Sequence, residues 1–244
     1  MPAELASFPE EGFMSPILES AEVPVVSPAR LDARLVTGWR HFGEKFFRYN
    51  FTFQDNVLCG VLALRIRLAS ATLTKSQRRV LRRNADLKTR LVPAAHCAAY
   101  DRLFERHKTR FTENVPNSLR DFLSERPAEI PCANMALEVR LGNELFAVSF
   151  MDLGAESASS VYAVFDPEHS ARSLGIFTLL LEIEHARKLG KRFLYLGYAY
   201  TIPSVYDYKK AFNDVESYDW DRCWIPLPKD FSWSREVEIT EDGL

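Results

Sequence analysis

Residues 161–198 read VYAVFDPEHSARSLGIFTLLLEIEHARKLGKRFLYLGY, and this stretch contains the clearest helix signal in the chain. Its apolar residues recur at helical spacing, as they do on the buried side of an amphipathic helix: Ile176, Leu179, Leu180, Ile183 and Leu189. The helix is predicted to begin at Gly175 and to stop at Gly190, where a C′ glycine belongs. Residues 161–165 and 192–198 are rich in β-branched and aromatic residues, as strands are. The stretch therefore predicts a β-α-β unit.

Further strands are predicted on the N-terminal side of this unit. Residues 136–140 and 145–150 predict two strands joined by the turn pair Gly142-Asn143. Residues 58–68 alternate apolar and basic side chains, as a half-buried strand does. Together with the β-α-β unit, these strands predict an α+β fold in which a mixed sheet is flanked by helices.

The N-terminal part has a different pattern. Residues 1–29 are broken by prolines and are predicted to be irregular. Residues 31–48 carry apolar side chains at spacings of three and four, which predicts a helix. A second helix is expected within residues 75–90, capped by Thr74 or Ser76.

The domain change is expected between these helices and the β-rich part. Residues 100–126 are polar and mostly helical in character, and residues 126–131 are the best candidate linker. We predict a smaller α/β N-terminal domain over residues 1–92 and a catalytic domain over residues 93–244.

The bulk composition is that of an ordinary globular protein. The chain has 244 residues, of which 47% are hydrophobic and 26% charged. A net charge of −2 gives no global attraction to nucleic acid, so such an attraction must come from a local patch. No run of 18 apolar residues predicts a membrane span, and the acidic N-terminus lacks a secretory signal. We expect a cytoplasmic protein with no membrane contact.

Cysteine and histidine spacing predicts no metal site. The cysteines are widely separated and form no CxxC pair: Cys59, Cys97, Cys132 and Cys223. The five histidines show neither metal-ligand nor triad spacing. We therefore expect free thiols, no bound metal and no cofactor.

The β-α-β stretch resembles the central motif of the GNAT superfamily, the N-acetyltransferase fold. In that fold a splayed strand offers backbone amides to the acyl donor, and the loop before the helix binds the donor's phosphates. Residues 172–177 of this loop read RSLGIF. Users of acetyl-CoA carry glycine or alanine where this chain has Phe177, whose bulk we expect to crowd a diphosphate. A CoA-dependent N-acetyltransferase remains an alternative, and the spacing alone also fits other β-α-β units.

Three stretches resemble the arginyl- and leucyl-tRNA–protein transferases, which are relatives of this fold. The first carries SVY, DP and SLG at residues 160–162, 166–167 and 173–175. The second carries YLGY at residues 195–198, followed by Tyr208-Lys209 and Phe212. The third carries KSQRR and RNADL at residues 75–79 and 83–87, similar to a signature of the bacterial members. The resemblance covers residues 30–226.

The resemblance implies transfer of an aminoacyl group from tRNA to the α-amine of an acceptor protein or peptide, usually one with an acidic first residue. About a tenth of such amines are neutral at pH 7. The reaction then needs positioning, a proton acceptor and oxyanion donors, and it needs no nucleophilic triad. The catalytic candidates are Tyr162, Asp166 and Lys209. The substrate-binding candidates are Arg172, Ser173, Gly175, Tyr198 and Tyr208.

Several of these candidates have more than one interpretation. Arg172 and Lys209 are candidates for the acceptor's acidic side chain, but Arg172 could serve the donor's phosphate and Lys209 a local carboxylate. Tyr198 or Tyr208 could stack on the terminal adenosine of the tRNA. Asp166 is equally a turn residue before proline.

The predicted helix within residues 75–90 is the candidate tRNA-binding surface. It holds seven Lys or Arg residues against one acid, Asp86. Like charges at i, i+4 cost stability unless a polyanion offsets them. The tRNA-binding candidates are Lys75, Arg78, Arg79, Arg82 and Arg83. The alternative is a solvated helix face paired with acids from elsewhere in the chain.

Two departures from the family leave details open. The family's N-terminal cysteine cluster is reduced to Cys59, and residues 201–206 lack the Cys and Met often found there, which leaves the acceptor open. A leucyl donor needs an apolar pocket and an arginyl donor a buried carboxylate. Several acids are available for the latter role: Glu182, Glu184, Asp207, Asp214 and Glu216. A non-catalytic tRNA-binding relative is the third reading.

Overall fold

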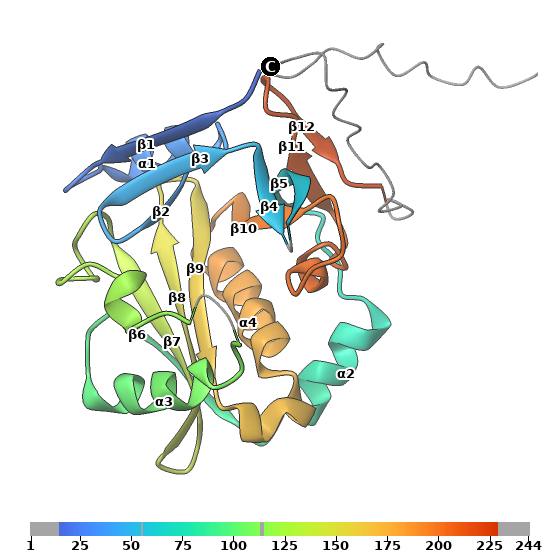
Figure 1. Ribbon diagram of the computed structural model, residues 1–244. Helices are drawn as coiled ribbons and strands as arrows, with labels where there is room; N and C mark the ends of the chain where they lie inside the picture. The colour runs from blue at the N-terminus through green and yellow to red at the C-terminus, as the bar shows by residue number, and fades with distance from the viewer. Residues whose placement is uncertain (1–14, 55, 113–114, 229–244) are drawn as a thin grey trace, which may run out of the picture.

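The computed structural model describes residues 15–54, 56–112 and 115–228, and its main feature is one nine-stranded mixed sheet (Figure 1). The strands are β4 (Phe51–Gln54), β5 (Val57–Arg67), β6 (Lys88–Pro93), β7 (Asn134–Leu141), β8 (Glu144–Leu153), β9 (Ser157–Phe165), β10 (Phe193–Tyr200), β11 (Val215–Tyr218) and β12 (Trp224–Pro226). Their order in the sheet is β12-β11-β5-β10-β9-β8-β7-β6, and β4 pairs with β5 outside this path.

The β-α-β unit predicted from residues 161–198 is confirmed. Helix α4 (Leu174–Lys188) connects β9 to β10, and these two strands pair in parallel. Most side chains of α4 are buried. The helix therefore buries more of its surface than the single apolar face that the sequence predicted. Gly190 follows it with a φ of +71°, a left-handed conformation that glycine adopts without strain.

Helices cover both faces of the antiparallel half of the sheet. β7 and β8 form the predicted hairpin, and alternate residues of β8 face opposite sides. Met151 packs in the core cluster that contains α4 residues, whereas Phe150 packs in the cluster of helix α3 (Ala98–Lys108). The predicted α+β architecture, a mixed sheet with flanking helices, is thereby confirmed.

A small sheet and a short helix lie over one end of the main sheet (Figure 1). They consist of α1 (Pro28–Leu35), β1 (Leu18–Glu22), β2 (Arg40–Phe42) and β3 (Lys45–Tyr49), with strand order β1-β3-β2. The helix predicted over residues 31–48 is therefore wrong beyond residue 35, and the irregular N-terminus contains a strand. Residues 1–14 lie outside the described part of the chain.

Two glycines explain why the helix prediction fails. Gly38 has a φ of +85° and Gly43 a φ of +53°, and each turns the chain where a helix would have continued. Phe46 packs in one buried cluster with Leu31 and Leu35. The apolar residues at helical spacing therefore belong to two elements, α1 and the β2–β3 hairpin, which pack in one shared core. They do not form one continuous helix.

Helix α2 (Lys75–Arg83) begins as predicted but is shorter than residues 75–90. Thr74 and Gln77 form a capping box at its start. Asn84 ends it, because its side-chain amide donates to the Val80 carbonyl at 2.9 Å. Residues 88–93 then form the edge strand β6. Within residues 100–126, helix α3 ends at Lys108, and among the described residues of this range only a short 3-10 turn, η1 (Leu119–Asp121), follows.

Strands from both sides of residue 92 share the main sheet. β5 pairs with β10 and with β11, both from the C-terminal half, and β6 pairs with β7. The predicted division at residue 92 stays a prediction, and it would have to cut through this sheet.

Candidate active site

The candidate site lies where β9 and β10 separate. The two strands are in parallel register only from Ser157 to Ser159 against Phe193 to Tyr195. Beyond these pairs, register irregularities occur in β9 against β8 and in β10 against β5. Gly197 lies just past the last pair with a φ of +81°. The strands therefore splay apart and leave room for side chains between them, as the resemblance to the acetyltransferase fold implied.

Two cations meet beside Gly197 in this splay. The Arg40 guanidinium donates from Nη1 to the Ser159 hydroxyl at 2.6 Å and from Nη2 to the Ser160 carbonyl. Lys209 Nζ donates to the Tyr198 carbonyl at 3.1 Å. A Cβ added at Gly197 would lie 3.4 Å from both Arg40 Nη2 and Lys209 Nζ. Glycine thus lets both cations approach the strand backbone.

Glu182 supplies the opposite charge from α4. Glu182 is 1% exposed, and neither of its carboxylate oxygens has a well-formed hydrogen bond among the described residues. Burial raises the pKa of Glu182 to about 7, although the Ser149 and Ser160 hydroxyls and the Arg40 charge favour the ionised form. Such a carboxyl group can exchange a proton near neutral pH.

Lys209 is tuned toward the same pH range. Burial lowers its pKa to about 7, the Arg40 charge lowers it further, and the Glu182 charge acts in the opposite direction. Its Nζ lies 4.8 Å from the centroid of the Tyr206 ring. Lys209 and Glu182 are therefore two oppositely charged groups that both titrate near pH 7 in one place.

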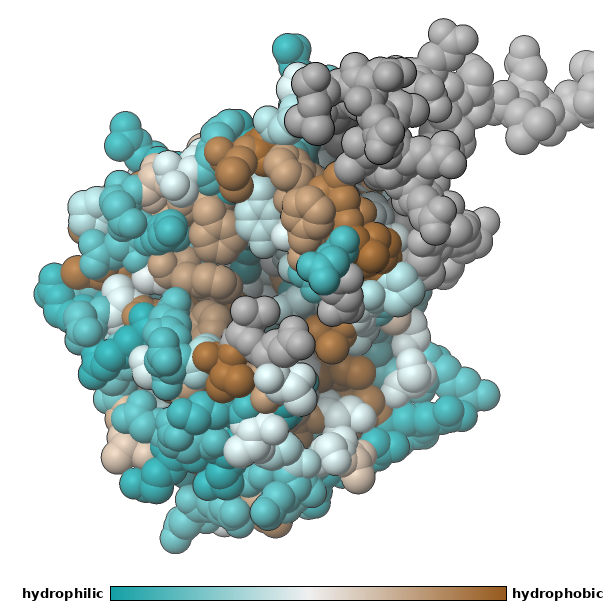
Figure 2. Space-filling view, viewed as in Figure 1, coloured by the Kyte–Doolittle hydropathy of each residue, from teal (hydrophilic) through white to brown (hydrophobic). Residues whose placement is uncertain are grey.

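Aromatic side chains surround this polar group. The Tyr162 ring stacks on Phe122 at a centroid distance of 3.7 Å, and Tyr206 contacts Tyr200 edge-on at 5.7 Å. Burial raises the pKa of Tyr208 to about 12, and the Glu182 charge adds to this shift, so the two side chains are neighbours. The space-filling view shows a hollow on this face with apolar side chains around it (Figure 2).

The loop predicted to bind the donor's phosphates, residues 172–177, leads into α4 and is called the donor loop here. Ser173 adopts a left-handed φ of +55°, and a Cβ added at Gly175 would lie 3.0 Å from the Phe165 ring. Arg172 forms a bidentate ion pair with Asp86, at 2.8 and 2.9 Å. Asn84 also donates to the Arg172 carbonyl at 2.9 Å. The loop is therefore fastened to the end of α2, and Arg172 is engaged by a carboxylate of this chain.

The basic face of α2 lies beside this loop. All five predicted tRNA-binding residues are exposed: Lys75, Arg78, Arg79, Arg82 and Arg83. Arg83 donates to the Ala171 carbonyl, and Arg78 donates to the Leu73 carbonyl at 2.5 Å. No ion pair within the described residues involves Lys75, Arg79 or Arg82. Their hydrophilic side chains project from the molecule in Figure 2 at the place of α2 in Figure 1.

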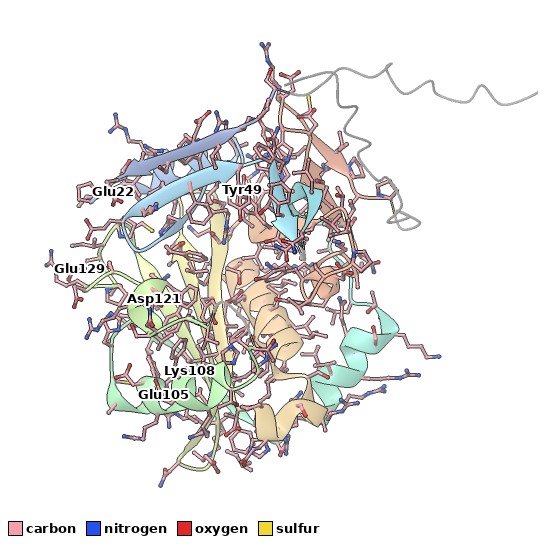
Figure 3. The ribbon with its side chains drawn as sticks, in the orientation of Figure 1. Glu22, Tyr49, Glu105, Lys108, Asp121 and Glu129 are labelled. Atoms are coloured by element: carbon pink, nitrogen blue, oxygen red, sulfur yellow. The ribbon has the colours of Figure 1, made fainter. Side chains whose placement is uncertain are left out.

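The side chains of two sequence candidates make structural contacts within the chain. Asp166 pairs with Arg106 at 2.8 Å and caps the 3-10 segment η2 (Pro167–Arg172) by accepting from the Glu168 amide at 3.0 Å. Tyr198 is 8% exposed and donates to the Gly38 carbonyl at 2.7 Å. Tyr49, labelled in Figure 3 near the end of β3, packs edge-on against Tyr198 at 5.0 Å, so no open ring face remains there for a base.

The structure brings Tyr208 and Lys209 to the splay, and Ser173 and Gly175 to the donor loop. Tyr162 lies on β9 past the last parallel pair, and its ring packs on the α3 side of the sheet. Sequence reasoning missed Arg40 and Tyr206, and it considered Glu182 only for reading an arginyl donor. Arg40 lay inside a wrongly predicted helix. Glu182 gave a usable signal, because it falls between Leu181 and Ile183 on the buried part of the α4 sequence.

A family model and several known proteins match this chain. A family model described as "Arginine-tRNA-protein transferase, C terminus" matches residues 96–219. The chain is 32% identical over 222 residues to an aspartate/glutamate leucyltransferase of Marinobacter nauticus, covering 87% of this chain and 91% of that protein. It is 34% identical over 201 residues to one of Stenotrophomonas maltophilia, covering 79% and 78%. The crystal structure of FemX resembles it with a TM-score of 0.45, at 9% identity, covering 77% and 65%.

The matching family model and the curated relatives show that the chain is an enzyme of the acyltransferase class. Within that class, the chain belongs to the arginine-tRNA-protein transferase family, whose model and relatives cover most of it. Every helix among the described residues is too short or too polar to cross a lipid bilayer.

Proposed function

We propose that this enzyme transfers leucine from aminoacyl-tRNA to the N-terminal α-amine of a protein or peptide that begins with an acidic residue, in the cytoplasm. Family membership supports aminoacyl-tRNA as the donor. The names of the curated relatives support leucine and an Asp or Glu acceptor. The observation that carries the proposal is the splay, in which Arg40, Glu182 and Lys209 meet.

In the proposed reaction, the acceptor nitrogen attacks the ester carbon of the aminoacyl-tRNA. The C–N bond forms, and the excess proton on nitrogen passes to the Glu182 carboxylate. The C–O bond to the tRNA ribose then breaks, and Lys209 donates a proton to the departing oxygen. Arg40 stays charged beside Gly197 and favours the negative charge that develops on the carbonyl oxygen.

The donor's nucleic acid is proposed to bind the exposed face of α2. Lys75, Arg79 and Arg82 are available for phosphates, whereas Arg172 and Arg83 hold α2 to the donor loop. Phosphate contacts on α2 would therefore place the tRNA next to the N-terminus of α4. This arrangement connects the polyanion to the acyl site.

Arg110 is proposed to read the acidic first residue of the acceptor, in place of Arg172. Its guanidinium lies 4.4 Å from the centroid of Phe165, and its charge acts on Tyr162, Tyr206 and Tyr208. A guanidinium on aromatic rings at the mouth of the splay can bind a carboxylate in a bidentate manner.

The sequence argued against acetyl-CoA because Phe177 was expected to crowd the diphosphate of the donor. The structure removes this reason. Phe177 is 4% exposed and packs in the main core cluster, so its ring does not stand in front of the loop. Membership of a tRNA-dependent family is what favours aminoacyl-tRNA over CoA.

A transfer assay tests the proposal. Purified enzyme would be given labelled leucyl-tRNA, arginyl-tRNA or acetyl-CoA, each with peptides that begin with Asp, Glu or Ala. We expect label to move from leucyl-tRNA to the Asp and Glu peptides. Transfer of arginine instead would keep the reaction and change the donor, and Glu182 would then be tested as a guanidinium ligand. Transfer only from acetyl-CoA, or none, would overturn the proposal.

A further inference from the structure

A buried group of metal-ligand type lies outside the splay, where the small sheet meets the main sheet. His41 comes from β2, Cys132 precedes β7 and Asp152 comes from β8. These residues are 5%, 4% and 1% exposed, respectively. One ligand atom of each lies within 4.8 Å of the others. Their wide separation in sequence is why residue spacing predicted no metal site.

The distances within this group are close to those of a metal site. His41 Nε2 lies 2.9 Å from Asp152 Oδ2 and 3.9 Å from Cys132 Sγ. Around a tetrahedral ion with bonds of 2.0 to 2.3 Å, neighbouring ligand atoms are about 3.3 to 3.6 Å apart. Each observed distance differs from this range by less than about half an ångström, which small side-chain rotations supply.

Outer partners already orient two of the three ligands. His41 Nδ1 donates to the Gly43 carbonyl at 2.9 Å, which directs Nε2 toward Cys132 and Asp152. Asn134 donates to Asp152 Oδ1 at 2.8 Å and leaves Oδ2 to face His41. Metal-binding histidines and carboxylates in proteins are typically held by such partners.

An independent feature also indicates a missing ligand. Asn134 Oδ1 is buried and has no hydrogen-bond partner among the described residues. A cavity of about 10 Å³ is lined by His41, Asn134 and Asp152, among others. That volume is about what one water molecule requires. A water held there could donate to Asn134 and complete a four-coordinate ion.

We propose that His41, Cys132 and Asp152 bind one divalent transition-metal ion of the zinc class, with a water as the fourth ligand. One imidazole, one thiolate and one carboxylate form a ligand set that such an ion accepts. When the ion binds, His41 Nε2, Cys132 Sγ and Asp152 Oδ2 coordinate it in place of the direct contact between His41 and Asp152. The Cys132 thiol gives up its proton to solvent as the thiolate-to-metal bond forms.

The ion would join two parts of the fold. Its ligands come from β2 of the small sheet, from β8 of the main sheet and from the segment that leads into β7. Arg40 directly precedes His41 in β2, so the ion would also fix the strand that delivers Arg40 to the splay. The role is structural, and it requires no step in acyl transfer.

Cobalt substitution tests the site directly. The full-length protein would be stripped of metal under reducing conditions and titrated with Co²⁺, which reports tetrahedral geometry and thiolate ligation by its absorption bands. We expect one equivalent to bind with a thiolate-to-cobalt band that Zn²⁺ abolishes. Cys132→Ser should lose that band, and Cys59→Ser, which changes another buried thiol, should keep it. Asn134→Ala should weaken binding about ten- to a hundredfold.

Thermal unfolding provides a second measurement of metal binding. Zn²⁺ should raise the thermal unfolding midpoint of the wild type and of Cys59→Ser but not of Cys132→Ser, with circular dichroism confirming that each variant is folded. If folded wild-type protein shows no thiolate band at one equivalent of Co²⁺, the proposal is overturned. A band that persists in Cys132→Ser would assign the metal to the exposed Cys97 or Cys223 and would equally overturn it.

Discussion

Lys209 Nζ donates a 3.1 Å hydrogen bond to the carbonyl oxygen of Tyr198. The bond runs from the 3-10 turn η3 (Asp207–Lys209) to β10, so it holds the ammonium group beside Gly197, where Arg40 also approaches. A flexible lysine side chain is thereby fixed at the point where the sheet opens. Its charge state, together with that of Glu182, should control the reaction.

The pH dependence of transfer should be bell-shaped around pH 7. Glu182 must be ionised to accept a proton, so kcat should fall as the pH drops through its pKa of about 7. Lys209 must be protonated to donate, so kcat should also fall as the pH rises through its pKa of about 7. Glu182→Gln should lose the acid limb and Lys209→Met the alkaline limb, each with about a hundredfold lower kcat. An acid limb that persists in Glu182→Gln would belong to the acceptor amine and would exclude Glu182 as the base.

Glu182 should also cost stability at neutral pH. Its pKa rises from 4.5 in the unfolded chain to about 7 in the fold, so its contribution is fully present below pH 4.5 and is lost as the pH rises to about 7. The shift corresponds to an order of 3 kcal/mol. Glu182→Gln should therefore be more stable than the wild type at pH 8 and similar to it at pH 4.5. Urea unfolding at the two pH values checks this, and an equal effect at both would contradict it.

Removing charge from α2 should reduce the salt dependence of tRNA binding. Arg79→Ala with Arg82→Ala deletes two exposed cations that have no ion pair within the described part of the chain. The slope of log K against log salt should become smaller by about 1.5. Arg30→Ala on α1 is the control, because this exposed cation lies on the small sheet's helix. If the double variant keeps the wild-type slope, α2 is not in the tRNA site.

Arg172 and Asp86 should act as one unit. Because their ion pair fastens the donor loop to α2, Arg172→Ala and Asp86→Ala should raise the KM for aminoacyl-tRNA by a similar factor, and the double variant should add little more. If Arg172 instead binds a donor phosphate directly, Asp86→Ala would leave KM unchanged or lower it. A double-mutant cycle on KM separates the two roles.

Asp166→Asn should affect stability more than catalysis. The change weakens the pair with the half-exposed Arg106 and the cap of η2, for a loss of about 1 kcal/mol in unfolding free energy. Since Asp166 does not reach the splay, kcat should stay within about twofold of the wild type. Denaturant unfolding and the transfer assay measure the two effects. A hundredfold drop in kcat with unchanged stability would return Asp166 to the catalytic group.

Local signals predicted the β-α-β unit, the β7–β8 hairpin and the start of α2. Each of these rests on short-range chemistry: helical apolar spacing, a glycine turn and a capping box. The helix expected over residues 31–48 failed because its apolar spacing is shared by α1 and β3, which meet in one core cluster. In the local sequence, only Gly38 and Gly43 distinguish one long helix from a short helix followed by a hairpin.

The site was harder to predict than the fold. Motifs that resemble the family pointed to Tyr162 and Lys209, whose catalytic roles stay predictions. Arg40 could not be found in this way, because β2 reaches the splay only through tertiary packing. The catalytic role of Asp166 stays a prediction, but its structural contacts could not be foreseen from the sequence. Asp166 lies at the end of β9 within a motif of the family, but its side chain caps the next turn. This role is visible only in its contacts with Arg106 and the Glu168 amide.

The place of β5 in the sheet has a consequence for how the chain folds during synthesis. The hairpin with β4 can form early, but Leu62 pairs with Ala199 and Leu64 with Ser217, which leave the ribosome far later. Until then, β5 exposes an apolar strand with unpaired edges to the crowded cell. Such late pairing slows folding and favours aggregation. The nascent protein should therefore depend on chaperones that cover its first half until the last strands arrive.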